Sequence, residues 1–231
     1  MTKIILSLEK PKHFQIAYQV KDFVDGWKVN HIGLDYISQS RFNEWAKLDG
    51  YTLAREREIF FDCKLWDTPN TVKTVVEKFL KMGASMATIS TYNSEEVFEE
   101  LKEYHDKIKL LGVTYPTSWT AQDQYEITRE MPDQMWKRAI RRCKGFYGMV
   151  CSPLDIVDIK HNDIDEDLKT ICPGITLPIR RAAPSGQVRT TTPKEAQDLG
   201  ADYIVIGRTI TDAKNPVEIA KKIKKTLDIS A

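Results

Sequence analysis

The sequence predicts one α/β domain over residues 1–231, a closed (β/α)8 TIM barrel. Short apolar runs alternate with longer amphipathic runs along the whole chain, eight times in all, as a barrel of this kind requires. Several apolar runs are continuous, as in residues 203–206, which is typical of parallel strands covered on both faces. The competing fold, an open doubly wound sheet, usually has a glycine-rich loop after its first strand, and residues 8–11 contain no glycine.

Apolar periodicity and end signals place each element. The expected strands are 3–8, 26–31, 59–63, 85–90, 108–114, 146–151, 168–172 and 202–206. The expected helices are 11–22, 36–47, 70–82, 94–105, 131–143, 152–159, 193–199 and 215–227. Gly83 is expected to end one helix, and Thr192 with Pro193 to begin another. The connections 114–130 and 173–191 are long for simple turns, and such loops often have a function.

The composition excludes several classes of protein. Lys and Arg number 34 against 33 Asp and Glu, so no broad basic field is available for nucleic acid. Apolar runs are too short for a membrane span or a signal peptide, and we expect a cytoplasmic protein without a membrane partner. The four cysteines, at 63, 143, 151 and 172, form no metal-ligand spacing. Buried free thiols in a reducing compartment are therefore expected.

The motif Asp62-x-Lys64-x-x-Asp67 is the most informative part of the chain. Residues two apart on a strand point to the same face, so Asp62 and Lys64 should project together, with Asp67 just past the strand end. Catalytic residues of such barrels lie at the C-terminal strand ends. Solvated ion pairs, each contributing about 0–1 kcal/mol, produce the same pattern. The motif alone therefore leaves both interpretations open.

Lys28 lies inside an otherwise apolar run. Lysine is rarely buried without a partner, and Asp62 on the next strand is available to pair with it. The alternative is a lysine whose long stem extends to solvent near the strand end.

The loops after the seventh and eighth strands have the character of a phosphate site. Gly207 and Arg208 follow the last strand, and a basic loop containing Gln187 follows the seventh. Barrels often bind phosphate there, and arginine can bind phosphate through two parallel hydrogen bonds. The alternative is that the glycine makes a turn and the arginine only covers the barrel rim.

The chain resembles a known family in stretches spread over most of its length. The matching stretches are Leu6–Glu9, Lys28–Val29, Asp62–Thr71, Val113–Thr114 with Thr117–Ser118, Gly148–Ser152, Pro173–Ile175, Gln187–Arg189, Thr192–Pro193 and Gly200–Arg208. In them the chain is similar to the orotidine 5′-phosphate decarboxylase family. The resemblance implies a homodimeric barrel that converts orotidine 5′-phosphate to uridine 5′-phosphate in de novo pyrimidine biosynthesis, without a cofactor or metal.

The resemblance also implies roles for individual residues. Lys28, Asp62 and Lys64 would form one subunit's catalytic site, while Asp67 and Thr71 would reach the partner's site. Lys64 would stabilise and protonate the ring carbanion. The remaining substrate-binding residues would be Glu9 at the ribose, Ser118 at the pyrimidine, Pro173 in its Pro-Gly-Ile motif, and Gln187, Gly207 and Arg208 at the phosphate.

The chain departs from the family pattern in five places. Glu9 replaces an aspartate, Asn30 a usual glycine, and Ser185-Gly186-Gln187 a common Gly-Asp-Gln. Trp66 is bulky for its position and Pro116 is unusual. These changes bear on affinity and loop geometry more than on reaction type.

Two other functions stay open on the sequence. One is a Mg²⁺-dependent sugar-phosphate synthase or decarboxylase of the same superfamily, and the other is a non-catalytic nucleotide-binding barrel. The segment 119–130 is interpreted either as a cover over the pyrimidine or as a dimer contact.

Overall fold

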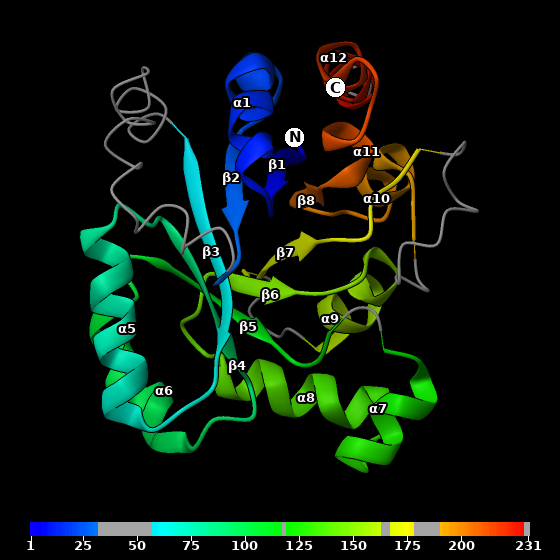
Figure 1. Ribbon diagram of the computed structural model, residues 1–231. Coiled ribbons are helices and arrows are strands. Elements are labelled where there is room, and N and C mark those ends of the chain that lie inside the picture. The colour runs from blue at the N-terminus through cyan, green and yellow to red at the C-terminus, as the bar shows by residue number, and fades with distance from the viewer. Residues whose placement is uncertain (32–56, 117–118, 163–166, 178–189, 229–231) are drawn as a thin grey trace.

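A computed structural model describes residues 1–31, 57–116, 119–162, 167–177 and 190–228. Its strands form a closed barrel in which each strand pairs in parallel with its neighbour in the sequence, and β8 pairs with β1 (Figure 1). The strands are β1 (Lys3–Leu8), β2 (Gly26–Val29), β3 (Glu58–Leu65), β4 (Met86–Ser90), β5 (Lys109–Val113), β6 (Gly148–Val150), β7 (Lys169–Cys172) and β8 (Tyr203–Ile206). The predicted TIM barrel is confirmed, with strand ends that differ from the prediction by a few residues.

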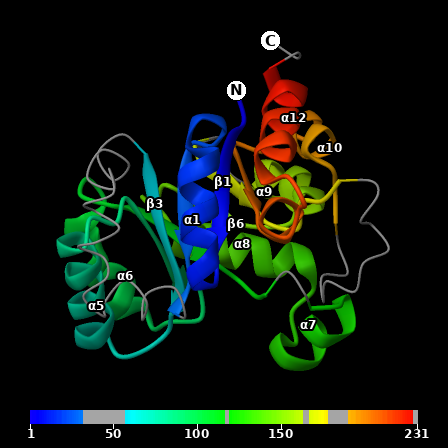
Figure 2. The same cartoon turned by 45° about the horizontal axis from the view of Figure 1, so that its top comes forward.

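Helices cover the outside of the barrel. They are α1 (Pro11–Val20), α5 (Pro69–Lys81), α6 (Glu95–Leu101), α7 (Ala121–Thr128), α8 (Pro132–Arg142), α9 (Ile156–Asn162), α10 (Pro193–Asp198), α11 (Arg208–Thr211) and α12 (Pro216–Asp228). Short 3-10 helices are η1 (Lys21–Phe23), η3 (Lys102–Tyr104) and η4 (Pro153–Asp155). Figure 2 shows α1 and α12, which are in contact, side by side on the outer surface. None of these helices has the length and apolarity that crossing a membrane requires.

Helix ends follow the local signals in most places. Gly83 has a φ of 84° just after α5, and Thr192 accepts a hydrogen bond from the Glu195 amide at the start of α10, as predicted. The connection after β5 was expected to be a loop, and this is wrong over α7. Thr120 and Asp123 form a capping box there, a signal present in the sequence. The expected helix 36–47 lies outside the described residues.

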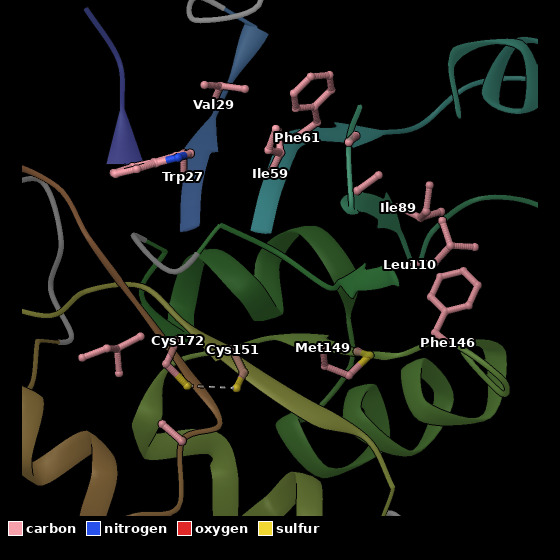
Figure 3. Packing of buried hydrophobic residues seen from close by; sticks show 14 of the residues in the cluster. Trp27, Val29, Ile59, Phe61, Ile89, Leu110, Phe146, Met149, Cys151 and Cys172 are labelled. Carbon is pink, nitrogen blue, oxygen red and sulfur yellow. Dashed lines mark hydrogen bonds between the residues drawn. The ribbon is translucent and has the colours of Figure 1, made fainter. Parts of the chain in front are cut away.

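The apolar side chains form two packed layers separated by the strands. Along β3, Ile59 and Phe61 face outward into a cluster shared with the helices, while Phe60 faces inward with Ile5 and Met86 to fill the barrel. Figure 3 shows part of the outer cluster, including Ile59 and Phe61. Because both faces of a strand are buried, the strands appear in the sequence as continuous apolar runs.

The prediction of free, buried thiols is confirmed for three of the four cysteines. Cys143, Cys151 and Cys172 are buried and free, and Cys63 is free and half-buried. Cys151 directly follows β6 and Cys172 ends the neighbouring β7, with their sulfur atoms 3.7 Å apart (Figure 3). Burial raises the pKa of Cys143 above its usual value.

A polar network closes the N-terminal end of the barrel. Glu58, the first residue of β3, has a side chain only 13% exposed that pairs with Lys109 and Lys3. It also accepts a 2.8 Å hydrogen bond from the Ser85 hydroxyl. The buried carboxylate is thus held by several donors, at the end of the barrel opposite to the C-terminal strand ends.

We expect Glu58→Gln to lower the free energy of unfolding by about 1–3 kcal/mol, because two ammonium groups lose their buried counter-charge. Urea unfolding followed by circular dichroism measures this. The control is Glu99→Gln, which removes an exposed partner of Lys102 and should cost about 1 kcal/mol at most. Equal losses in the two variants would contradict a structural role for the network.

Candidate active site

A cavity of about 370 Å³ opens at the C-terminal ends of the barrel strands. Five of the predicted site residues line it: Glu9, Lys28, Asp62, Lys64 and Pro173. The other lining residues are Asn30, His31, Phe60, Cys63, Val113, Tyr115, Pro116, Val150, Ile171 and Val205. Residues of β2 and β3, and residues that directly follow β1 and β7, therefore meet in one place, as catalytic residues of a barrel do.

Asp62 is held between two lysines. Its Oδ2 accepts a 2.9 Å hydrogen bond from Lys28 Nζ, and its Oδ1 accepts one of 2.8 Å from Lys64 Nζ. The Lys28 and Asp62 side chains are each only 12% exposed, whereas Lys64 is 44% exposed. Lys28 thus has the carboxylate partner predicted for it, and its low exposure contradicts the alternative of a side chain that extends to solvent.

The two lysines keep Asp62 ionised. Burial alone would raise the pKa of Asp62, but the charges and hydrogen bonds of Lys28 and Lys64 outweigh it and lower that pKa to about 2. The cavity therefore contains a carboxylate flanked by two ammonium groups, with the more exposed ammonium, Lys64, reaching into the opening.

The backbone of Lys64 is unusual. Its φ is 48°, and the register between β3 and β4 shifts between Phe61 and Leu65. The Lys64 amide donates to Thr88 Oγ1 at 2.8 Å, and the Thr88 hydroxyl contacts Asp62 Oδ1 at 3.3 Å. Strained backbone of this kind often marks a functional residue. The alternation argument placed Asp62 and Lys64 together correctly, but the β-bulge was not predicted, and neither was Thr88.

Glu9 is held in position by two neighbours that the sequence reasoning missed. Its carboxylate oxygen lies 3.2 Å from the Ser7 hydroxyl, and its amide donates to His13 Nδ1 at 3.1 Å. Burial lowers the pKa of His13, in keeping with a neutral ring that accepts this bond. A serine inside an apolar strand and a histidine four residues after Glu9 were the available signals.

Apart from Asn30, His31 and the Cys63 thiol, the rest of the cavity wall is mainly apolar. Tyr115 is buried and stacks on Trp119, with ring centroids 6.1 Å apart. Burial, followed by the Asp62 charge, raises the pKa of Cys63 to about 11. An apolar wall beside a charged array strengthens electrostatic interactions inside the cavity. Within the described ranges, no cluster of three His, Cys, Asp or Glu side chains is arranged to hold a metal ion.

Four of the predicted site residues lie outside the cavity lining. Asp67 and Thr71 are exposed at the start of α5, where Asp67 Oδ1 accepts a 2.7 Å hydrogen bond from the Thr68 amide. Gly207 follows β8 directly and Arg208 is the first residue of α11, and a Cβ on Gly207 would be 3.5 Å from Ser7 Cβ. The other two, Ser118 and Gln187, lie outside the described residues.

Comparisons with known proteins agree on one family. The model of the "Orotidine 5′-phosphate decarboxylase / HUMPS family" matches residues 2–223. The orotidine 5′-phosphate decarboxylase of Wolbachia pipientis subsp. Culex pipiens is 38% identical over 174 residues, which cover 73% of this chain and 75% of the relative. That of Opitutus terrae is 34% identical over 232 residues, covering 95% and 96%.

Solved structures support the fold. The orotidine 5′-monophosphate decarboxylase from Methanocaldococcus jannaschii, complexed with the inhibitor BMP, has a TM-score of 0.73 at 22% identity and covers 99% of both chains. An uncharacterised conserved protein from Geobacillus kaustophilus has a TM-score of 0.72 at 24% identity, covering 97% of this chain and 99% of the other. The resemblance read from the sequence is confirmed: the chain belongs to the orotidine 5′-phosphate decarboxylase / HUMPS family.

Proposed function

We propose that this protein is a carboxy-lyase that converts orotidine 5′-phosphate to uridine 5′-phosphate in de novo pyrimidine biosynthesis. It works in the cytoplasm without a cofactor. The observation that carries the proposal is the Lys28–Asp62–Lys64 array, present with hydrogen-bond geometry in a cavity of a chain that belongs to this family.

The chemical step requires stabilisation of a carbanion. The bond between the ring carbon and the carboxylate breaks, carbon dioxide leaves, and the electron pair stays on the ring carbon. Lys64 lies beside that carbon, stabilises the negative charge, and then donates a proton to it. Solvent returns a proton to the amine. The exposure of Lys64, 44% against 12% for Lys28, supports this choice between the two lysines.

Asp62 lowers the activation barrier less than Lys64 does. It faces the substrate carboxylate, and two like charges 4 Å apart repel by about 4 kcal/mol at an effective dielectric constant near 20. Enzymatic accelerations generally require about 8–23 kcal/mol. Repulsion is therefore the minor contribution, and the preorganised charge of Lys64 is the major one. Asp62 also holds both lysines in place.

Binding groups surround this centre. Glu9 contacts the ribose hydroxyls, Pro173 and Ser118 contact the pyrimidine, and Gln187, Gly207 and Arg208 bind the phosphate. The position of Gly207 and Arg208 directly after β8 supports the phosphate assignment. Phosphate contacts distant from the ring supply binding energy that is used to orient the reacting carbon.

The protein acts as a homodimer in which Asp67 and Thr71 complete the partner's site. Two observations support this. Both residues are exposed and absent from their own cavity lining, and the adjacent Trp66 side chain is 73% exposed. Because Trp66 is adjacent to Asp67 in the chain, a second copy whose site receives Asp67 is expected to cover Trp66.

The direct test is to incubate the purified protein with orotidine 5′-phosphate and to follow the loss of the orotate absorbance, with and without EDTA. We expect turnover that the chelator does not change. Turnover that EDTA abolishes would instead support the Mg²⁺-dependent alternative, and no turnover under either condition would support the non-catalytic barrel.

Lys64→Ala and Asp67→Ala should each abolish turnover while circular dichroism shows a retained fold. Unfolding the two variants together and refolding them should restore about one quarter of wild-type activity. Half of the dimers are then mixed, and each mixed dimer contains one intact site built from both chains. Each variant refolded alone is the control. An inactive mixture would contradict the shared site, and an active Lys64→Ala variant would contradict the mechanism.

The lowered pKa of Asp62 predicts a pH-dependent contribution to stability. This contribution is present above the unfolded-state pKa of 3.8 and is lost as pH falls through about 2. It is worth about 2 kcal/mol at pH 6, and roughly half should be gone at pH 3. Urea unfolding of wild type and Asp62→Asn at both pH values measures it, with Asp22→Asn on the surface as control. A difference between wild type and Asp62→Asn that does not change with pH would contradict the assignment.

A further inference from the structure

Two polar side chains outside the cavity lining bind the backbone of the segment Lys64–Asp67. Thr88 lies in β4 and Asn93 lies in the loop that follows β4, and neither side chain lines the cavity. We infer that Thr88 and Asn93 are positioning residues that determine the positions of Lys64 and Asp67. The inference deepens the proposed function and rests on it for its catalytic consequence.

Thr88 holds the start of the segment. It is fully buried, and its hydroxyl oxygen accepts the Lys64 amide at 2.8 Å while donating to Asp62 Oδ1 at 3.3 Å. The Lys64 φ of 48° falls in a region that residues other than glycine rarely adopt. One hydroxyl therefore holds this unusual backbone and the carboxylate that orients the Lys64 ammonium.

Asn93 holds the end of the segment. Its side chain is 2% exposed and uses both parts of its amide. Nδ2 donates to the carbonyl oxygens of Leu65 and Ser90, each at 2.9 Å, and Oδ1 accepts the Asp67 amide at 3.1 Å. Because one side faces carbonyls and the other an N–H group, the amide orientation is determined.

The loop that carries Asn93 is itself anchored to α8. Arg138 donates to the Thr91 carbonyl at 3.0 Å, and Arg142 donates to the carbonyls of Thr91 and Asn93. Arg138 is in turn paired with Glu130, with Nε and Oε1 2.7 Å apart. These bonds tie the Asn93 loop to α8 at several points, so Asn93 is a fixed support rather than a mobile contact.

The two supports have separate consequences in the proposed dimer. Lys64 serves its own cavity and Asp67 serves the partner's, and only two residues separate them in the sequence. Thr88 acts through Lys64 and Asp62, and Asn93 acts through Asp67. A small displacement of a reacting group can cost on the order of 100-fold in rate, so both supports should affect kcat more than KM.

The first experiment compares Thr88→Val with Thr88→Ser. Valine keeps the size but removes the hydroxyl, and we expect kcat to fall on the order of 10- to 100-fold with KM changed less than about threefold. Serine keeps the hydroxyl and should restore kcat to within about threefold. Wild-type kcat in Thr88→Val, or failure of serine to rescue a folded protein, would overturn the role of Thr88.

The second experiment tests Asn93 with a readout that does not need activity. In Asn93→Ala, hydrogen–deuterium exchange of the Asp67 amide should speed up on the order of tenfold or more as its acceptor is lost, and kcat should fall. Ser94→Ala is the matched control, since Ser94 is exposed and its side chain makes no capping bond to α6. Ser94→Ala should change neither quantity.

The outcomes separate this inference from the proposed function. If wild type shows no decarboxylase activity, the proposed function fails. Exchange of the Asp67 amide in Asn93→Ala, and of the Lys64 amide in Thr88→Val, then still decides whether Asn93 and Thr88 hold these amides. If wild type turns over but Asn93→Ala keeps its kcat and its Asp67 exchange rate, the role of Asn93 is overturned.

Discussion

The site depends on one buried carboxylate that is shared by two lysines. Asp62 presents one oxygen to Lys28 and the other to Lys64, so neither ammonium can move without breaking a short charge-assisted hydrogen bond. The cost of burying the carboxylate is offset only while both lysines remain in place. Such an arrangement is preorganised, since the charges are oriented before any substrate arrives.

The barrel separates this site from the structures that stabilise the fold. At the N-terminal end, Glu58 with its lysines and Ser85 closes the barrel, and inward-facing residues such as Phe60 fill the interior below the cavity. At the C-terminal end, the β3–β4 register shift leaves Lys64 with a left-handed backbone. The packed interior and the N-terminal end of the barrel hold the strands in place, so that the C-terminal end can tolerate the strained backbone of Lys64.

Side chains of β4 and of the loop after it hold the segment Lys64–Asp67 in position. Three main-chain groups between Lys64 and Asp67 bond to Thr88 or Asn93, and the loop with Asn93 is tied to α8 through Arg138 and Arg142. At the end of a strand, main-chain groups lose their hydrogen-bond partners on the neighbouring strand. Here side chains of β4 and of the loop after it supply those partners. The proposed catalytic segment thus takes its shape from residues that do not line the cavity.

Much of the fold was predictable because its signals are local. The order of strands and helices follows from apolar runs, and helix ends follow from residues such as Gly83 and Thr192. The helix α7 was not predicted, although its capping box is also a local signal. Residues 114–130 were assigned as a loop from the length of the connection alone. In the site, Asp62, Lys64 and Lys28 were found because an acid and two lysines at strand ends are conspicuous in apolar sequence.

By itself, the sequence determined the element order, the barrel and the charged groups, since periodicity and residue type are properties of neighbouring positions. Only the tertiary structure decided the bulge at Lys64, the supports at Thr88 and Asn93, and the position of Asp67 outside the cavity lining. These contacts join residues 24 or 26 positions apart. Their geometry is set by the pairing register of β3 with β4, which no single stretch of sequence specifies.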